Sequence, residues 1–281
     1  MRLFLAGVST SNLSPMWKDY TDALCSGVDE RSAFHQALCR FMRTEQPPVC
    51  PRWEELCVLE SYFYARKNEK LGVLIPRTKH FLLDSGAFSF MQGTGGHCDW
   101  DRYTNEYCDY INKYAIEDFF ELDIDNIVGI REVERLRTLI ERRTNRKVIP
   151  VWHVERGKQY FIDMVKEYPY VALGSIAKVV PGKQKILPKY FPWFIQTAKE
   201  HGSKVHALGY TPKDMHGIPF FSVDSTNWIY GNMTGSVCRF DHHKGVMTST
   251  SRAGFRLRNR EACVWNYNEW VKYMNYAERY L

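Results

Sequence analysis

Carboxylates follow short apolar runs at three places in this chain. Asp84 follows Phe-Leu-Leu, Asp123 follows Phe-Phe-Glu-Leu, and Asp224 follows Phe-Phe-Ser-Val. Removing an unpaired carboxylate from water is costly, so a buried strand should not end in one without a reason. Carboxylates at the carboxyl ends of parallel strands build the active sites of (β/α)8 barrels. We therefore expect an enzyme whose carboxylates act at the mouth of a barrel.

Further polar groups stand at predicted strand ends. Asp125 lies two residues after Asp123, so both face one side if the strand continues. We favour the alternative, in which Asp125 caps the next helix and Asp123 alone faces the site. His153 ends another apolar run, where a structural and a functional role are equally supported. Gly174 with Ser175, and Leu208 with Gly209, end two more runs, where glycine amides can face a ligand oxygen or simply permit tight packing.

The surroundings of Asp224 and Asp84 indicate their chemistry. Asp224 is followed by Ser-Thr-Asn, whose hydroxyls and amide can orient a carboxylate for attack on an anomeric carbon. Asp84 is followed by Ser85 and a glycine, which permit a sharp turn close to a ligand. Phe88 would then lie flat over a bound ring. The alternative is an ordinary turn in which Asp84 caps the strand end.

Apolar runs alternate with helical patterns, as in βα units. Seven strands are predicted, at residues 2–8, 80–84, 118–123, 147–153, 170–174, 204–208 and 219–224. The eighth is open, with 236–240 and 246–248 as candidates. Helical patterns cover residues 32–42, 53–67, 100–114, 132–143, 159–166, 191–201 and 261–280. We expect one (β/α)8 (TIM) barrel domain over 1–281, with residues 11–75 as a helical insertion after the first strand.

Positive charge is concentrated near the C-terminus. The chain has a net charge of +6, and residues 239–260 hold six Lys or Arg against one Asp. Five of these cations are predicted to contact nucleic acid: Lys244, Arg252, Arg256, Arg258 and Arg260. A solvated segment before the last helix is the alternative.

Cysteine usage and hydropathy indicate the compartment. The eight cysteines are scattered, with no C-x-x-C pair and no zinc-like Cys/His spacing. No apolar stretch approaches the roughly 20 residues that span a bilayer. We expect reduced thiols in a cytoplasmic protein without a membrane partner.

The ordered set of motifs resembles the tRNA-guanine transglycosylase superfamily. The resemblance extends from about residue 81 to 258 and is greatest to the 7-deazaguanine DNA transglycosylases of bacterial and phage modification systems. It implies that Asp224 is the nucleophile, Asp84 the general acid/base and Phe88 the stacking aromatic. It also implies that Asp123 reads the guanine edge and that His153 stands where the tRNA enzymes use glutamine. The remaining base-binding positions that it implies are Ser85, Asp125, Gly174, Ser175, Leu208 and Gly209.

One departure favours DNA over tRNA as the substrate. The tRNA enzymes carry a C-x-C-x-x-C…H zinc site that helps to grip tRNA, and nothing in this sequence matches it. The resemblance therefore implies exchange of guanine in DNA for a free 7-deazaguanine base such as preQ0, without a cofactor and with room for a partner protein that targets DNA. The alternatives are a tRNA enzyme without zinc, a barrel N-glycoside hydrolase and a nucleic-acid-binding module without turnover.

Overall fold

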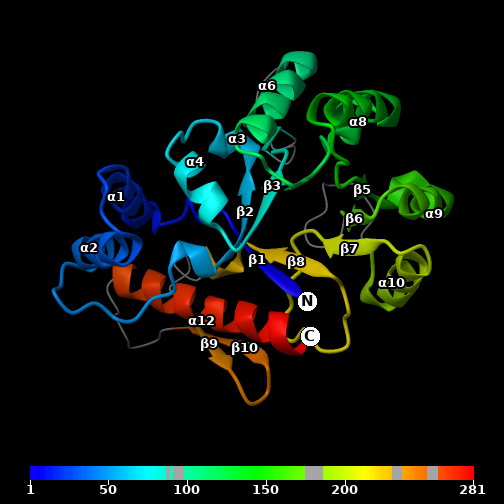
Figure 1. Cartoon of the computed structure of the whole chain (residues 1–281). Coiled ribbons are helices and arrows are strands. Elements are labelled where there is room, and N and C mark those ends of the chain that lie inside the picture. The colour runs from blue at the N-terminus through cyan, green and yellow to red at the C-terminus, as the bar shows by residue number, and fades with distance from the viewer. Residues whose placement is uncertain (87–88, 91–97, 175–185, 230–235, 252–258) are drawn as a thin grey trace.

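The computed structural model describes residues 1–86, 89–90, 98–174, 186–229, 236–251 and 259–281. Its centre is an eight-stranded parallel sheet within a mixed α/β fold (Figure 1). The strands of this sheet are β1 (Arg2–Ala6), β2 (Cys57–Ser61), β3 (His80–Asp84), β4 (Asp118–Phe119), β5 (Val151–Trp152), β6 (Tyr170–Leu173), β7 (Lys204–Ala207) and β8 (Ser222–Ser225).

The sheet curls until its two edges meet. The strand order is β4-β3-β2-β1-β8-β7-β6-β5, so β4 and β5 are the edges. A parallel bridge joins Phe120, after β4, to Ile149, before β5. Two backbone hydrogen bonds accompany it, from the Glu121 amide to Ile149 (3.1 Å) and from the Ile149 amide to Phe119 (2.8 Å). This arrangement is compatible with a (β/α)8 barrel.

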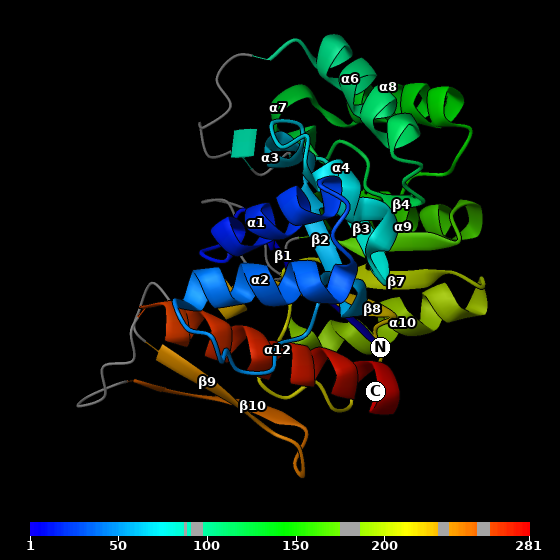
Figure 2. The ribbon, with the colours of Figure 1, turned by 60° about the vertical axis from the view of Figure 1, so that its left-hand side comes forward.

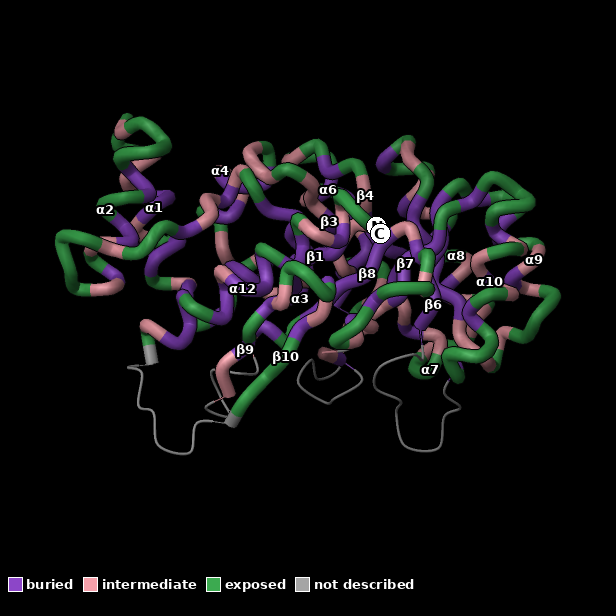
Figure 3. Tube along the Cα trace, turned by 90° about the horizontal axis from the view of Figure 1, so that it is seen from below, coloured by how far each residue is buried: buried purple, intermediate pink, exposed green. Residues whose placement is uncertain are grey.

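Helices lie around the outside of the sheet (Figure 1). They are α1 (Ser14–Cys25), α2 (Glu30–Met42), α3 (Tyr62–Ala65), α4 (Leu71–Leu74), α6 (Trp100–Lys113), α7 (Asp125–Val128), α8 (Ile130–Thr144), α9 (Gly157–Glu167), α10 (Phe191–Glu200) and α12 (Asn259–Tyr280). Short 3-10 turns cover Trp53–Glu55, Ile75–Arg77, Val154–Arg156 and Pro188–Tyr190. The inner faces of the α-helices pack on the strands, and buried residues concentrate along the sheet (Figure 3).

Local sequence signals set several helix ends. The Asp99 side chain accepts a hydrogen bond from the Arg102 amide at the start of α6 (3.0 Å). Asp29 does the same for the amides of Arg31 and Ser32 at the start of α2. Asn145 ends α8 in the left-handed conformation that asparagine tolerates. These caps explain why the predicted helices 32–42, 100–114 and 132–143 are confirmed.

A hairpin and the last helix form a separate layer beside the sheet (Figure 2). Strands β9 (Ser236–Asp241) and β10 (Val246–Ser251) pair antiparallel with each other. Helix α12 contacts β9 and also β1, and the amino group of Met1 donates to the Ala277 carbonyl of α12 (3.2 Å). The predicted closing helix at 261–280 is thereby confirmed.

The seven predicted barrel strands are confirmed, but the eighth lies elsewhere. It is β2, which hydrogen-bonds between β1 and β3 inside the expected helical insertion 11–75. The predicted helix 53–67 is therefore wrong: a 3-10 turn, β2 and the short α3 occupy it. The reason is that the first four residues of β2 are buried on both faces, so the period-two alternation of a strand is absent. The other candidates, 236–240 and 246–248, are strands of the β9–β10 hairpin.

The register decides which side chains enter the interior. Ser222 is paired with His206, and Asp224 with Phe4. Paired residues of a parallel ladder point to the same face of the sheet, so His206, Ser222 and Asp224 share the inner face. Among the described residues, no helix is long and apolar enough to cross a membrane.

Candidate active site

The predicted site residues lie at the carboxyl ends of parallel strands. Asp84 ends β3, and Asp224 is the penultimate residue of β8. Asp123 follows β4, and His153 follows β5. Since the strands are parallel, these ends meet at one mouth. The structure therefore brings together the three aspartates and the histidine that the sequence predicts.

Asp84 is a partly buried carboxylate with a perturbed pKa. Burial raises the pKa of Asp84 to about 6, and the negative charges of Asp123 and Asp224 add to the rise. The Gly86 amide donates to Asp84 Oδ2 (3.0 Å), which partly opposes it. A carboxyl group with this pKa can both give and take a proton near neutral pH.

The turn after β3 depends on Gly86. Its φ is +84°, and a Cβ at this position would lie 2.6 Å from Cβ of Phe63. Glycine therefore allows the chain to turn sharply and aim its amide at Asp84. The sequence predicted this sharp turn.

Asp224 is anchored through one oxygen. The Gly209 amide donates to Asp224 Oδ1 (2.6 Å), and His206 Nε2 lies 3.1 Å from the same atom. The hydroxyl of Thr211 donates to the Asp224 carbonyl (2.7 Å), which fixes the backbone. No described residue bonds to Asp224 Oδ2. The carboxylate is therefore oriented, with one oxygen free of protein partners in the described part of the chain.

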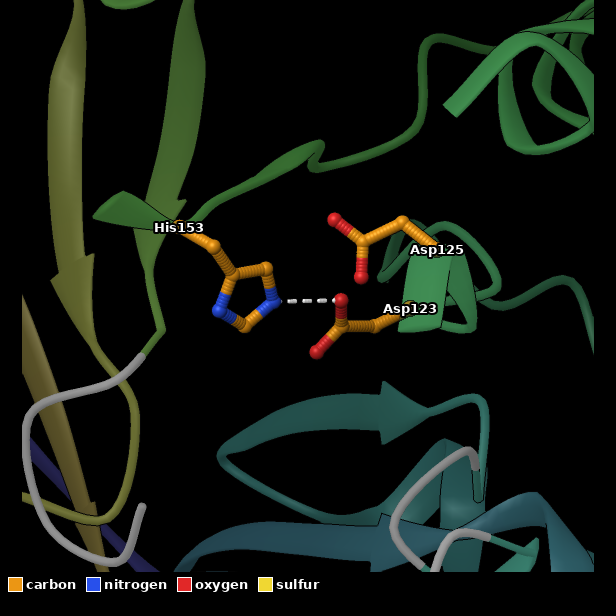
Figure 4. Close-up of side chains that lie close together, drawn as sticks. All are labelled: Asp123, Asp125 and His153. Atoms are coloured by element: carbon orange, nitrogen blue, oxygen red, sulfur yellow. Dashed lines mark hydrogen bonds and ion pairs between the residues drawn. The ribbon is translucent and has the colours of Figure 1, made fainter. Parts of the chain in front are cut away.

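Asp123 and His153 form a close pair (Figure 4). His153 Nε2 lies 2.6 Å from Asp123 Oδ1. Burial alone would raise the pKa of Asp123, but the charge and hydrogen bond of His153 hold it below its usual value. Burial likewise opposes the imidazolium, yet Asp123 keeps the pKa of His153 raised. The pair thus presents an acceptor and a donor side by side.

Asp125 is part of this group and does not cap a helix. It is the first residue of α7, and the preceding residue, Ile124, makes no side-chain cap. Its Oδ2 accepts from Arg156 Nε (3.2 Å), while its Oδ1 is buried without a hydrogen-bond partner among the described residues. Its side chain points toward His153 (Figure 4). The favoured interpretation of Asp125 as a helix cap was wrong.

Asp123, Asp125 and His153 also have the spacing of metal ligands at a cation site. One ligand atom from each of Asp123, Asp125 and His153 lies within 4.8 Å of the others. The side chain of Arg156, which is 2% exposed, already neutralises Asp125 and the nearby Glu121. The charges of these carboxylates are therefore balanced by side chains of the protein.

Gly174 has the packing role that the sequence analysis gave as the alternative to binding a ligand oxygen. Its amide donates to the Trp152 carbonyl (2.8 Å) within the sheet ladder, so it does not face a ligand oxygen. A Cβ at this position would lie 2.3 Å from Cε1 of His153. Gly174 instead makes room for the imidazole.

Two further predicted residues have other partners, and a third, Ser85, is buried. The Gly209 amide binds Asp224 and not a ligand oxygen. Leu208 is partly buried against the core, and its amide donates to Leu173 (3.1 Å). Ser85 is buried, and its hydroxyl has no hydrogen-bond partner in the described part of the chain.

Several predicted residues lie outside the described residues. They are Phe88, Ser175, Arg252, Arg256 and Arg258. Lys244 is exposed at the β9–β10 turn. Arg260 is exposed too, but its guanidinium donates to the Phe41 carbonyl (3.1 Å) and lies over the Phe41 ring. Arg260 therefore has an intramolecular partner on α2.

Sequence reasoning missed His206, Ser222, Tyr170 and Arg156. The first three are buried in the sheet, and Arg156 lies in the 3-10 turn after His153. One signal was available, because the predicted strand 204–208 carries a histidine between valine and alanine. A polar residue inside an apolar strand needs a buried partner.

Comparison with known proteins identifies no family. No family model and no curated protein matches this sequence. Two solved structures are similar, both of the carboxyl transferase domain of Rhizobium etli pyruvate carboxylase, each at 13% identity. One has a TM-score of 0.42 over 98% of this chain and 48% of the other; the second, with pyruvate, has 0.44 over 99% and 47%. The chain thus spans about half of their length, and neither similarity is close enough to carry an argument.

Proposed function

We propose that this chain is a DNA-guanine transglycosylase, a pentosyltransferase that exchanges guanine in DNA for a free 7-deazaguanine base. The observation that carries the proposal is the pair Asp84 and Asp224 at one barrel mouth in different environments. Asp84 has a pKa of about 6, whereas Asp224 is held by two donors to one oxygen. Carboxylates with contrasting environments suit separate acid/base and nucleophilic roles.

The fold in this proposal is a single (β/α)8 barrel domain. The parallel sheet whose edges meet supports it. Helices α1 and α2 are additional elements between the first two strands, and the β9–β10 hairpin follows the last. The protein would act in the cytoplasm, or in the host cytoplasm if a phage encodes it.

Asp224 supplies the nucleophile. The target nucleotide leaves the stack, because its C1′ cannot be reached inside a closed duplex. Asp224 Oδ2 then bonds to C1′ as the bond from C1′ to N9 of guanine breaks. The product is a glycosyl-Asp224 ester, with inverted configuration at C1′.

Asp84 moves the proton. In its protonated form it gives a proton to the departing guanine, and as a carboxylate it takes one from N9 of the incoming base. That base attacks C1′ from the opposite face and releases Asp224. Two inversions retain the β-configuration.

The Asp123–His153 pair recognises the base. A carboxylate accepts hydrogen bonds from the N1–H and exocyclic amine of guanine, and an imidazolium donates to the base carbonyl. Asp125 offers a carboxylate oxygen beside them that has no partner among the described residues. These groups support a purine-like base as the ligand.

DNA is the preferred polymer. Arg239 and Lys244 on the β9–β10 hairpin are exposed and can meet phosphates. The predicted cations Arg252, Arg256 and Arg258 follow in the sequence. A partner protein that targets the enzyme to DNA remains part of the proposal.

The test is incorporation of isotope-labelled 7-cyano-7-deazaguanine. Purified protein is incubated with label and duplex DNA, or with label and tRNA, and the digested nucleosides are analysed by mass spectrometry. We expect label in DNA, its loss with Asp224→Ala, and normal incorporation with Asp163→Ala, which removes an exposed carboxylate of α9. Normal exchange by Asp224→Ala would overturn the assignment of the nucleophile.

Other outcomes identify the alternatives. Label in tRNA alone would indicate a tRNA-guanine transglycosylase. Abasic sites that form without added base would indicate a hydrolase, in which water replaces the incoming base. Nucleic-acid binding that survives Asp224→Ala, with no turnover by the wild type, would indicate a binding module.

A further inference from the structure

A buried chain of polar side chains leads to Asp224 from beneath. His206 Nε2 lies 3.1 Å from Asp224 Oδ1, and His206 Nδ1 lies 2.6 Å from Ser222 Oγ. The hydroxyl of Tyr170 lies 2.5 Å from the same Ser222 Oγ. The three supporting residues come from three neighbouring strands, β6, β7 and β8, whose register places them on the inner face.

The partners of His206 fix the direction of these hydrogen bonds. A carboxylate only accepts, so Nε2 must carry the proton that is given to Asp224. In a neutral imidazole Nδ1 is then an acceptor, and the Ser222 hydroxyl must donate to it. Ser222 in turn accepts from Tyr170. Burial raises the pKa of Tyr170, which keeps its hydroxyl protonated as the donor at the end of the chain.

His206 is enclosed by the apolar core beneath Asp224. Its side chain is completely buried. The rings of Phe4 and Phe120 lie next to it, with centroids 6.2 and 5.3 Å away. The polar groups that its ring nitrogens meet in the described part of the chain are the Asp224 carboxylate and the Ser222 hydroxyl.

We propose that His206 is a positioning residue that holds Asp224 Oδ1, so that Oδ2 is the atom that attacks. This inference rests on the proposed transglycosylase function and deepens it. The Gly209 amide and His206 together occupy Oδ1, and Ser222 and Tyr170 keep His206 in the donating tautomer. When Asp224 later leaves C1′, the same two donors stabilise the charge that returns to the carboxylate.

The first test replaces the donor while keeping the shape of the site. His206→Phe removes the N–H, whereas His206→Gln retains an amide N–H that can reach Asp224. We expect kcat for exchange to fall roughly 30-fold or more in His206→Phe, and less than about 5-fold in His206→Gln, with KM for the free base within about 3-fold in both. His216→Gln, which changes an exposed histidine paired with Asp214, is the matched control.

The second test applies if the His206 variants do not fold. Ser222→Ala and Tyr170→Phe each remove only one hydroxyl, and we expect kcat to fall roughly 3- to 10-fold in each. If His206→Gln is as impaired as His206→Phe, or if both hydroxyl variants keep full kcat, the positioning role is overturned.

A third readout does not depend on activity. In the ¹⁵N NMR spectrum of imidazole-labelled protein, Nε2 of His206 should carry a proton, and Ser222→Ala should increase the tautomer that lacks it. A wild-type His206 without a proton on Nε2 overturns the inference about His206. Absence of exchange in the wild type, on DNA and on tRNA, would instead overturn the proposed function. The NMR spectrum would still show whether His206 donates to Asp224.

Discussion

Gly174 and His153, which directly follow β6 and β5, compete for the same space. A Cβ on Gly174 would lie 2.3 Å from Cε1 and 2.6 Å from Nδ1 of His153. Real Cβ atoms do not approach other atoms this closely, so any side chain at 174 must move the imidazole. The position of the Asp123–His153 pair is therefore set by a glycine that lies on the next strand of the sheet.

Gly174→Ala should damage base recognition more than turnover. Displacing His153 breaks its 2.6 Å contact with Asp123, so we expect KM for the free base to rise about 10-fold with a smaller change in kcat. The matched control is His153→Ala with and without Gly174→Ala, because removal of the ring removes the clash. Equal KM values for those two proteins are expected. Additive effects would contradict this explanation.

Asp84 should control the pH dependence of the second half-reaction. The incoming base loses its N9 proton to the Asp84 carboxylate, so release of a preformed glycosyl-enzyme should accelerate as pH rises through about 6. The midpoint should lie at or below that value, since the Asp224 charge that helps to raise the pKa of Asp84 is absent from the ester. Rapid-quench kinetics on the isolated glycosyl-enzyme, at a series of pH values, measure this midpoint. A pH-independent wild type, or a pH dependence retained by Asp84→Asn, would exclude Asp84 as the base.

Glu60 should make the protein less stable as pH rises. Burial raises the pKa of Glu60 from its ordinary 4.5 to about 7, while the Ser9 amide partly opposes the shift. The folded protein therefore holds this proton more tightly than the unfolded chain, and the stability that it contributes below about pH 4.5 is lost as pH rises through about 7. Glu60→Gln should recover about 3 kcal/mol at pH 8 and about 1 kcal/mol or less at pH 5. Urea denaturation of both proteins at the two pH values measures this difference, and an equal change at both would contradict it.

Glu121 should be essential to the barrel wall behind the site. Its fully buried carboxylate accepts from Arg137 (2.6 Å), Arg156 (2.9 Å) and the Val151 amide (2.8 Å). Glu121→Gln removes the carboxylate that Arg137 pairs with and leaves Arg156 with Asp125 alone, and we expect a loss of about 3–5 kcal/mol in the free energy of unfolding. Glu132→Gln, which breaks a surface pair with Arg135, should cost about 1 kcal/mol or less. Similar losses in the two variants would refute the prediction.

The β9–β10 hairpin should contribute to DNA binding without sequence preference. Replacing Arg239 and Lys244 by alanine should weaken binding equally on all duplexes and reduce the slope of log K against log salt by about 2. Lys199→Ala, on the exposed side of α10, serves as the control and should leave the slope unchanged. A fluorescence anisotropy titration at several salt concentrations gives both values. An unaltered slope in the double variant would remove the hairpin from the DNA interface.

The sequence alone predicted the seven strands that carry most of the site. Asp84, Asp123, His153 and Asp224 could be placed at one mouth because each ends a short apolar run, and parallel strands bring such ends together. The helices at 32–42, 100–114 and 132–143 were predictable for a similarly local reason, because each has a helical pattern along the chain. The strand β2 was missed because burial on both faces removes the alternation that identifies a strand.

Only the tertiary structure decided which residues of the site contact one another. The contacts of Gly174 with His153, of Arg156 with Asp125, and of His206 with Asp224 join residues on different strands or loops. Such contacts depend on the register between strands, and shifting a strand by one residue would turn its side chains to the other face. The types and order of the chemical groups are therefore local properties of the sequence, whereas their pairing is a property of the closed sheet.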